Sequence, residues 1–189
     1  MSYSNPTGLV SVTEIFSPYV TWEHISPSVL AAAADRGSRV HEALADDLSG
    51  DFSMLPADEM GYLDAGRKFL ENIETVVLVE KRLCSEAWKY TGQIDLIAQI
   101  KGDGFFTMID WKTSAVISKS WPLQLAAYRH LATKQHPIGR VMAVQLKRNG
   151  TFKINEYTNT EKDFNRFLNA LVTYQYFKPK AQDINWESL

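Results

Sequence analysis

The chain has 189 residues, and 20 basic against 22 acidic residues leave it with a net charge of -2. This balance excludes a histone-like polycation, but it does not exclude nucleic-acid binding, which needs only a local basic surface. The single cysteine, Cys84, excludes an internal disulfide framework and a four-cysteine zinc or iron–sulfur site.

The length predicts a single folded domain over residues 26–189, preceded by an irregular lead-in over residues 1–25. No run approaches the roughly 18 apolar residues of a membrane span. Residues 1–6 lack the basic and apolar regions of a secretory signal. We therefore expect a cytoplasmic protein without a membrane partner.

Two helices are predicted to open the domain. Ser26 is a favourable N-cap and Pro27 suits the first helical position, so a helix should start here. Apolar residues and a glycine then recur every three or four positions over residues 29–48, which is the period of a helix with one buried face. A second helix is expected over residues 60–73.

The middle of the chain is predicted to form strands. Residues 75–83 and 90–100 are rich in β-branched and other apolar side chains. The turn Lys101-Gly102-Asp103-Gly104 separates the second strand from a third over residues 105–112, so these two should pair as a hairpin.

Helical and extended segments alternate in the rest of the chain. A helix is predicted over residues 121–134, followed by strands over residues 139–147 and 152–157 that the turn Asn149-Gly150 joins. Thr160-Glu161-Lys162-Asp163 resembles a capping box and should open a last helix, which ends near Phe177. This order predicts an α/β (α+β) domain with a mixed sheet flanked by helices.

The predicted hairpin carries charged residues within apolar runs. Asp110 and Lys112 are two apart on one strand and therefore share a face, and Asp95 could sit across the hairpin on that face. Two close carboxylates repel each other, and a hard divalent cation such as Mg²⁺ or Mn²⁺ removes that penalty. A lysine beside such a cation suits phosphodiester hydrolysis. The alternative is an ordinary solvated strand face.

The segments Gly92-Gln93-Ile94-Asp95 and Asp110-Trp111-Lys112 resemble the core of the PD-(D/E)XK nuclease superfamily, in the form of its RecB-like exonuclease branch. Three further segments match that branch in the same order. They are Arg36-Gly37-Ser38-Arg39-Val40-His41, the acidic residue Glu80, and the pair Gln124 and Tyr128. The resemblance implies a restriction-endonuclease-like mixed central sheet flanked by helices.

The resemblance also implies roles for these residues. Asp95 and Asp110 would be the central metal ligands, together with His41 and the backbone carbonyl of Trp111. Lys112 would be the catalytic lysine, and Glu80 a further catalytic carboxylate near the metal. The remaining matched residues would bind DNA or brace the lysine: Gln124, Tyr128, Arg36 and Arg39.

Each of these roles has a structural alternative. His41 could be an ordinary hydrogen-bonded helix histidine, and Glu80 could pair with its neighbours Lys81 or Arg82. Gln124 and Tyr128 could simply pack on a helix.

The function implied by the resemblance is an Mg²⁺- or Mn²⁺-dependent DNA exonuclease, similar to stand-alone phage-type enzymes. No Walker A pattern is present, so ATP is not expected, and the lone cysteine argues against an iron–sulfur cluster. The expected partner is DNA, bound at its ends without sequence preference, besides a homo-oligomeric copy or a recombination or repair protein. A phage enzyme would work in the host cytoplasm. The alternatives are a structure-selective or nicking endonuclease and a non-catalytic DNA-binding protein on a nuclease scaffold.

Overall fold

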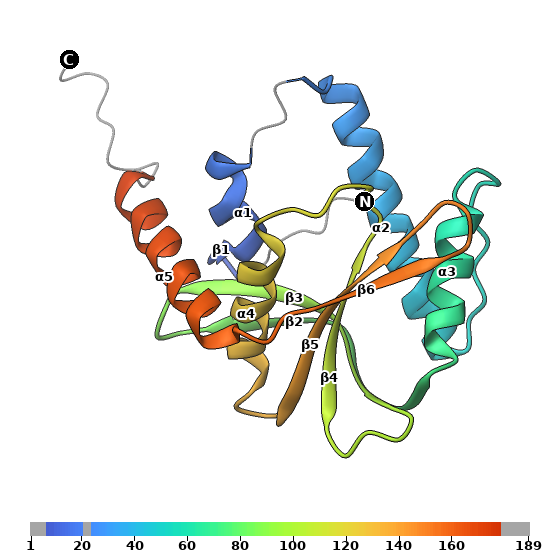
Figure 1. The fold of residues 1–189 in the computed structure, drawn as a ribbon. Coiled ribbons are helices and arrows are strands. Elements are labelled where there is room, and N and C mark those ends of the chain that lie inside the picture. Colours follow the sequence, from blue (N-terminus) through green and yellow to red (C-terminus); the bar gives the residue numbers. More distant parts are fainter. Residues whose placement is uncertain (1–6, 21–23, 179–189) are drawn as a thin grey trace.

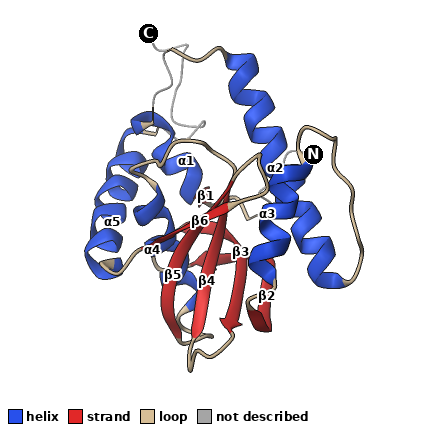
Figure 2. Cartoon of the chain, turned by 45° about the vertical axis from the view of Figure 1, so that its right-hand side comes forward, coloured by secondary structure: helices blue, strands red, loops and turns tan. Residues whose placement is uncertain are grey.

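A mixed six-stranded sheet forms the centre of the protein, and helices cover both of its faces (Figures 1 and 2). The computed structural model describes residues 7–20 and 24–178. The fold class is therefore the predicted mixed sheet flanked by helices. The strands are β1 (Val10–Ser11), β2 (Ile73–Ser85), β3 (Tyr90–Ile100), β4 (Phe106–Lys112), β5 (Ile138–Leu146) and β6 (Phe152–Glu156).

The pairing of β3 with its neighbours leaves a gap in the sheet. The antiparallel strand β2 covers one edge of β3 along its whole length. The other edge is shared: β1 pairs in parallel with residues 90–91, and β4 pairs antiparallel with residues 96–99. Among the described residues, positions 92–95 of β3 therefore have no strand partner on this edge. Strand β4 continues beyond the gap along β5, to which it is parallel.

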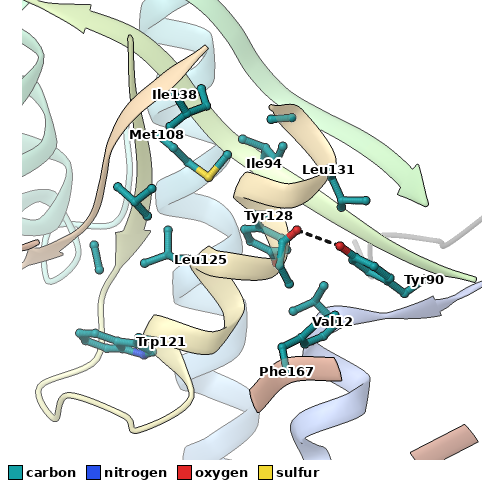
Figure 3. Close-up of a cluster of buried hydrophobic side chains, with 14 of the residues drawn as sticks. Val12, Tyr90, Ile94, Met108, Trp121, Leu125, Tyr128, Leu131, Ile138 and Phe167 are labelled. Carbon is teal, nitrogen blue, oxygen red and sulfur yellow. Dashed lines mark hydrogen bonds between the residues drawn. The ribbon is translucent and has the colours of Figure 1, made fainter. Parts of the chain in front are cut away.

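Two hydrophobic cores lie on opposite faces of the sheet. On one face, α1 (Val12–Phe16), α4 (Trp121–Ala132) and α5 (Thr160–Phe177) enclose a core that includes Tyr90, Ile94 and Tyr128 (Figure 3). On the other face, α2 (Pro27–Ser49) and α3 (Met60–Leu70) cover a core that includes Leu96 and Trp111. Within the described ranges, every helix is too short or too polar to span a bilayer.

The start of α2 confirms the predicted signal. Ser26 is the N-cap, its hydroxyl accepts a hydrogen bond from the backbone N–H of Val29, and Pro27 is the first helical residue. The helix ends at Gly50, whose φ of +89° is a left-handed conformation that glycine adopts without steric penalty.

Two local predictions differ from the structure. Residues 10–19 are not irregular, since they form β1, α1 and the 3-10 turn η1 (Ser17–Tyr19). The reason is tertiary, because Val12 and Ile15 are fully buried against the core. The predicted capping box is also wrong: Asn159, not Thr160, is the N-cap of α5, and no side chain caps this end.

Candidate active site

A cleft of about 510 Å³ opens at the gap beside β3. Its walls come from α1, α2, β2, β3, β4 and α4, so segments far apart in the sequence meet there. Most of the residues singled out in the sequence line it, namely His41, Glu80, Asp95, Asp110, Trp111, Lys112, Gln124 and Tyr128.

The gap places a carboxylate where a strand would otherwise pair. The backbone N–H of Trp111 donates to Asp95 Oδ2 at 2.8 Å instead of to a neighbouring strand. The Trp111 carbonyl oxygen lies 3.1 Å from His41 Nε2. Since Asp95 is only 6% exposed, this side chain takes over a main-chain hydrogen bond in the interior.

His41 joins two carboxylates from neighbouring strands. Its Nδ1 lies 3.4 Å from Asp95 Oδ2 and 3.6 Å from Glu80 Oε1. Burial opposes the charged imidazole, but the two carboxylates outweigh burial and raise the pKa of His41 to about 10. Burial likewise raises the pKa of Asp95, but the His41 charge outweighs it and the net shift is downward.

The donor set of this cluster fits a divalent cation. His41 Nε2 faces the Trp111 carbonyl, an acceptor, so this nitrogen carries the hydrogen. In a neutral ring the Nδ1 lone pair would then point at two carboxylates, which is favourable only if a proton or a cation lies between them. Glu80 Oε1 is buried and has no hydrogen-bond partner among the described residues. One imidazole nitrogen with carboxylate oxygens suits Mn²⁺ and Mg²⁺.

The catalytic lysine candidate lies in a chain of contacts beside this cluster. Lys112 Nζ lies 2.6 Å from Asp110 Oδ2 and donates to Gln124 Oε1 at 3.0 Å. Gln124 Nε2 in turn donates to the Tyr128 hydroxyl at 3.0 Å. Burial raises the pKa of Asp110 to about 6 despite the neighbouring ammonium. Burial also raises the pKa of Tyr128, whose hydroxyl stays protonated.

The structure separates the two arginines from this cleft. Arg39 forms a two-pronged ion pair with Glu59, with its Nε at 2.9 Å from Oε2 and an amino nitrogen at 2.6 Å from Oε1. The Arg36 guanidinium lies over the Tyr62 ring. Both are described residues and neither lines the cleft, so DNA binding by this pair stays a prediction.

The sequence analysis gave no role of their own to three cleft residues on β2 and β3, namely Arg82, Gly92 and Gln93. Glu80 contacts neither Lys81 nor Arg82 directly: Gln93 Nε2 donates to Glu80 Oε2 at 2.7 Å, and Arg82 donates to Gln93 Oε1 at 3.0 Å. The signal for Gln93 was its position two residues before Asp95, on the same strand face. The signal for Gly92 was a glycine inside a strand, which marks a close approach, here by the Tyr128 ring.

Comparisons with known proteins found a matching family and a relative. Residues 54–185 match the model of the PD-(D/E)XK nuclease superfamily. Mitochondrial genome maintenance exonuclease 1 of Mus musculus is 32% identical over 102 residues, which are 49% of this chain and only 30% of that protein. The matched segment therefore spans less than a third of the relative's length.

Two solved structures resemble the fold loosely. The crystal structure of SSO0001 is 18% identical, with a TM-score of 0.49, over 98% of this chain and 83% of that one. An alkaline exonuclease from Laribacter hongkongensis is 14% identical, with a TM-score of 0.45, over 93% and 94% of the two chains. With TM-scores below 0.5, these likenesses add nothing to the assignment. The assignment rests on the family match, which covers residues 54–185 and thus more than half of this chain. The chain therefore belongs to the PD-(D/E)XK nuclease superfamily.

Proposed function

We propose that this protein is a metal-dependent deoxyribonuclease that hydrolyses phosphodiester bonds at DNA ends without ATP. One observation carries the proposal: the cluster of His41, Glu80 and Asp95 and the ion pair of Asp110 with Lys112 face the same cleft. Hydrolysis of a phosphodiester needs positive charge near the phosphate and a group that orients water, and this cleft offers residues for both.

The residues that would hold Mg²⁺ or Mn²⁺ are His41, Glu80, Asp95 and Asp110, with the Trp111 carbonyl. A cation bound there supplies positive charge that stabilises the negative charge developing on the phosphate. In the described structure, Asp110 stands apart from the three-residue cluster, because its Oδ2 pairs with Lys112. If Asp110 is a ligand, Asp110→Asn should weaken Mn²⁺ binding in a titration of the metal-free protein, and an unchanged Kd would remove it from the ligand set.

Lys112 would act on the substrate. An ammonium group has three N–H donors, and Asp110 and Gln124 engage two of them. The third can point into the cleft, where it would donate to a phosphate oxygen or orient the attacking water. Gln124 would brace the lysine rather than bind DNA, since both it and Tyr128 are buried. Water then adds across the P–O bond and leaves a phosphomonoester and a hydroxyl.

The preference for ends is the finer part of the proposal. The mouse relative is named an exonuclease, and the segment it shares with this chain is 32% identical. We propose that this chain is an exonuclease as well. We also propose that it works in the cytoplasm, in DNA recombination or repair.

The test compares two DNA substrates, one linear and end-labelled, the other a covalently closed circle. Each is incubated with Mg²⁺, Mn²⁺ or EDTA. The variants are Lys112→Met and, as a matched control, Lys153→Met, whose side chain is exposed on β6. We expect metal-dependent loss of the linear substrate by the wild type and the control, and no cleavage by Lys112→Met.

The other outcomes contradict defined parts of the proposal. Cleavage of the circle would replace the exonuclease with an endonuclease on the same site. Full activity of Lys112→Met would remove the lysine from the mechanism. DNA binding without cleavage of either substrate would indicate a binding protein on a nuclease scaffold.

A further inference from the structure

Glu80 has an unusual backbone conformation for a residue inside a strand. Its φ is +44°, a left-handed value that is unfavourable for a residue with a Cβ by about 1–2 kcal/mol. The strand register places Glu80 directly opposite Asp95, since Val79 pairs with Leu96 and Lys81 with Ile94. Such strain persists only where the surrounding contacts hold it, and it concentrates at functional sites.

The contacts that hold Glu80 come from a glutamine whose orientation is determined by an arginine. A guanidinium can only donate, so the atom of Gln93 that faces Arg82 at 3.0 Å must be the amide oxygen. The amide nitrogen of Gln93 then has to face Glu80, where it donates to Oε2 at 2.7 Å. The arginine therefore removes the alternative flip of the amide, which would set an oxygen against a carboxylate.

This contact gives the two oxygens of the Glu80 carboxylate different surroundings. Oε2 is satisfied by Gln93, whereas Oε1 is buried without a hydrogen bond and lies 3.6 Å from His41 Nδ1. The carboxylate is thereby held with a single free oxygen directed at the imidazole and Asp95. A ligand that is already held in this way loses little freedom when a cation binds.

We infer that Gln93, anchored by Arg82, is a positioning residue that aims the Glu80 carboxylate at the proposed metal site. The inference rests on the proposed function, because it assigns a role toward the cation that this function requires. Gln93 and Arg82 both line the cleft themselves, so they are placed to act on the site rather than on the core.

The test measures Mn²⁺ affinity of the metal-free protein by titration calorimetry, independently of cleavage. Gln93→Leu keeps the size of the side chain but has no donor. We expect its Kd for Mn²⁺ to rise by about 10–100-fold, as found when the hydrogen-bond partner of a ligand is removed. Arg82→Met leaves the amide free to flip and should raise the Kd by a smaller factor. In both variants the metal-free Tm should stay near the wild-type value. The hydrogen bond to Glu80 is lost or weakened, but relief of the backbone strain at Glu80 offsets that loss.

The matched control is Gln99→Leu on the same strand. Gln99 donates to the Asp103 carbonyl, away from the cleft, so its Kd for Mn²⁺ should not change. An unchanged Kd in Gln93→Leu, with a wild type that binds Mn²⁺, would overturn the inference alone. A lowered metal-free Tm with unchanged Kd would do the same and assign Gln93 a structural role. If Gln93→Leu does not fold, an unchanged Kd in Arg82→Met overturns it. A wild type that does not bind Mn²⁺ would overturn the proposed function itself.

Discussion

Gly92 lies so close to the Tyr128 ring that a single added methyl group should disturb the lysine. A Cβ at this position would lie 2.5 Å from Tyr128 Cε1 and 2.6 Å from Cδ1, whereas non-bonded carbons prefer about 3.5–4.0 Å. In Gly92→Ala the ring must therefore retreat by about 1 Å. Leu131 restricts that retreat, since its Cδ1 would be 3.2 Å from the same methyl group.

The size of the effect follows from this geometry. Forcing an extra methyl group into a packed core costs about 1–3 kcal/mol. For a chain of this length we expect Tm to fall by about 2–12 °C. A shift of about 1 Å also breaks the 3.0 Å hydrogen bond between Gln124 and the Tyr128 hydroxyl, and thus frees the group that holds Lys112. A misplacement of this size lowers kcat by up to about 100-fold.

Two measurements separate the effect on the packing of the Tyr128 ring from the effect on the hydrogen bonds that hold Lys112. Tm is measured without metal, and kcat is measured on the linear DNA. Adding Tyr128→Leu to Gly92→Ala should recover part of the lost Tm, because the smaller side chain makes room. It should not recover kcat, because the hydroxyl is missing.

Two results would refute the reasoning. Wild-type Tm and kcat in Gly92→Ala would mean that the ring does not pack against Gly92. Wild-type kcat in Tyr128→Phe, which keeps the ring, would mean that the hydroxyl does not brace Gln124 and Lys112.

Three further predictions concern the metal cluster. The pKa of His41 is about 10 in the folded protein and 6.5 ordinarily, so the protonated imidazole stabilises the folded state. This contribution to folding stability is complete below about pH 6.5 and is lost as the pH rises through 10. The metal-free Tm should therefore fall more steeply from pH 7 to 10 in the wild type than in His41→Gln, and parallel curves would contradict this. Mn²⁺ at 100 times its Kd should stabilise the protein by about 2.7 kcal/mol, measured as a rise in Tm that EDTA reverses; an equal rise in Asp95→Asn would exclude Asp95 as a ligand. Glu80→Gly relieves about 1–2 kcal/mol of backbone strain and adds about 0.5–1 kcal/mol of chain entropy loss. Glu80→Gly and Glu80→Ala both lose the contacts of the carboxylate with Gln93 and His41, but only glycine also relieves the strain. The metal-free Tm of Glu80→Gly should therefore exceed that of Glu80→Ala while Mn²⁺ affinity falls in both, and equal Tm values would contradict the strain.

Local sequence patterns were sufficient to predict most of the helices and strands of the fold. The 3.6-residue period and the Ser26-Pro27 start identified α2, and the turn at residues 101–104 identified the hairpin of β3 and β4. The alternation of strand side chains also placed Asp110 and Lys112 together, as their 2.6 Å contact shows. These features depend on residues close in sequence, whose preferences act before any long-range contact forms.

The same alternation fails at Asp95. It would place Ile94 and Leu96 on one face of the sheet, but Ile94 packs in the core beneath α4 and Leu96 in the core beneath α2. Strand β3 thus changes faces at Asp95, opposite the left-handed backbone of Glu80. Only contacts from distant segments can hold this irregularity, because neither residue favours it locally.

The sequence by itself therefore determined the order of the elements and the residue types of the site, because these rest on periodicity and on short motifs. The tertiary structure alone decided how those residues meet. It opened the gap beside β3, brought His41 from α2 to the two carboxylates, set Gln93 against Glu80, and held Arg39 at Glu59 outside the cleft. The three side-chain contacts join residues 13 or more positions apart in the sequence, and their free energy is gained only once both cores have packed against the sheet.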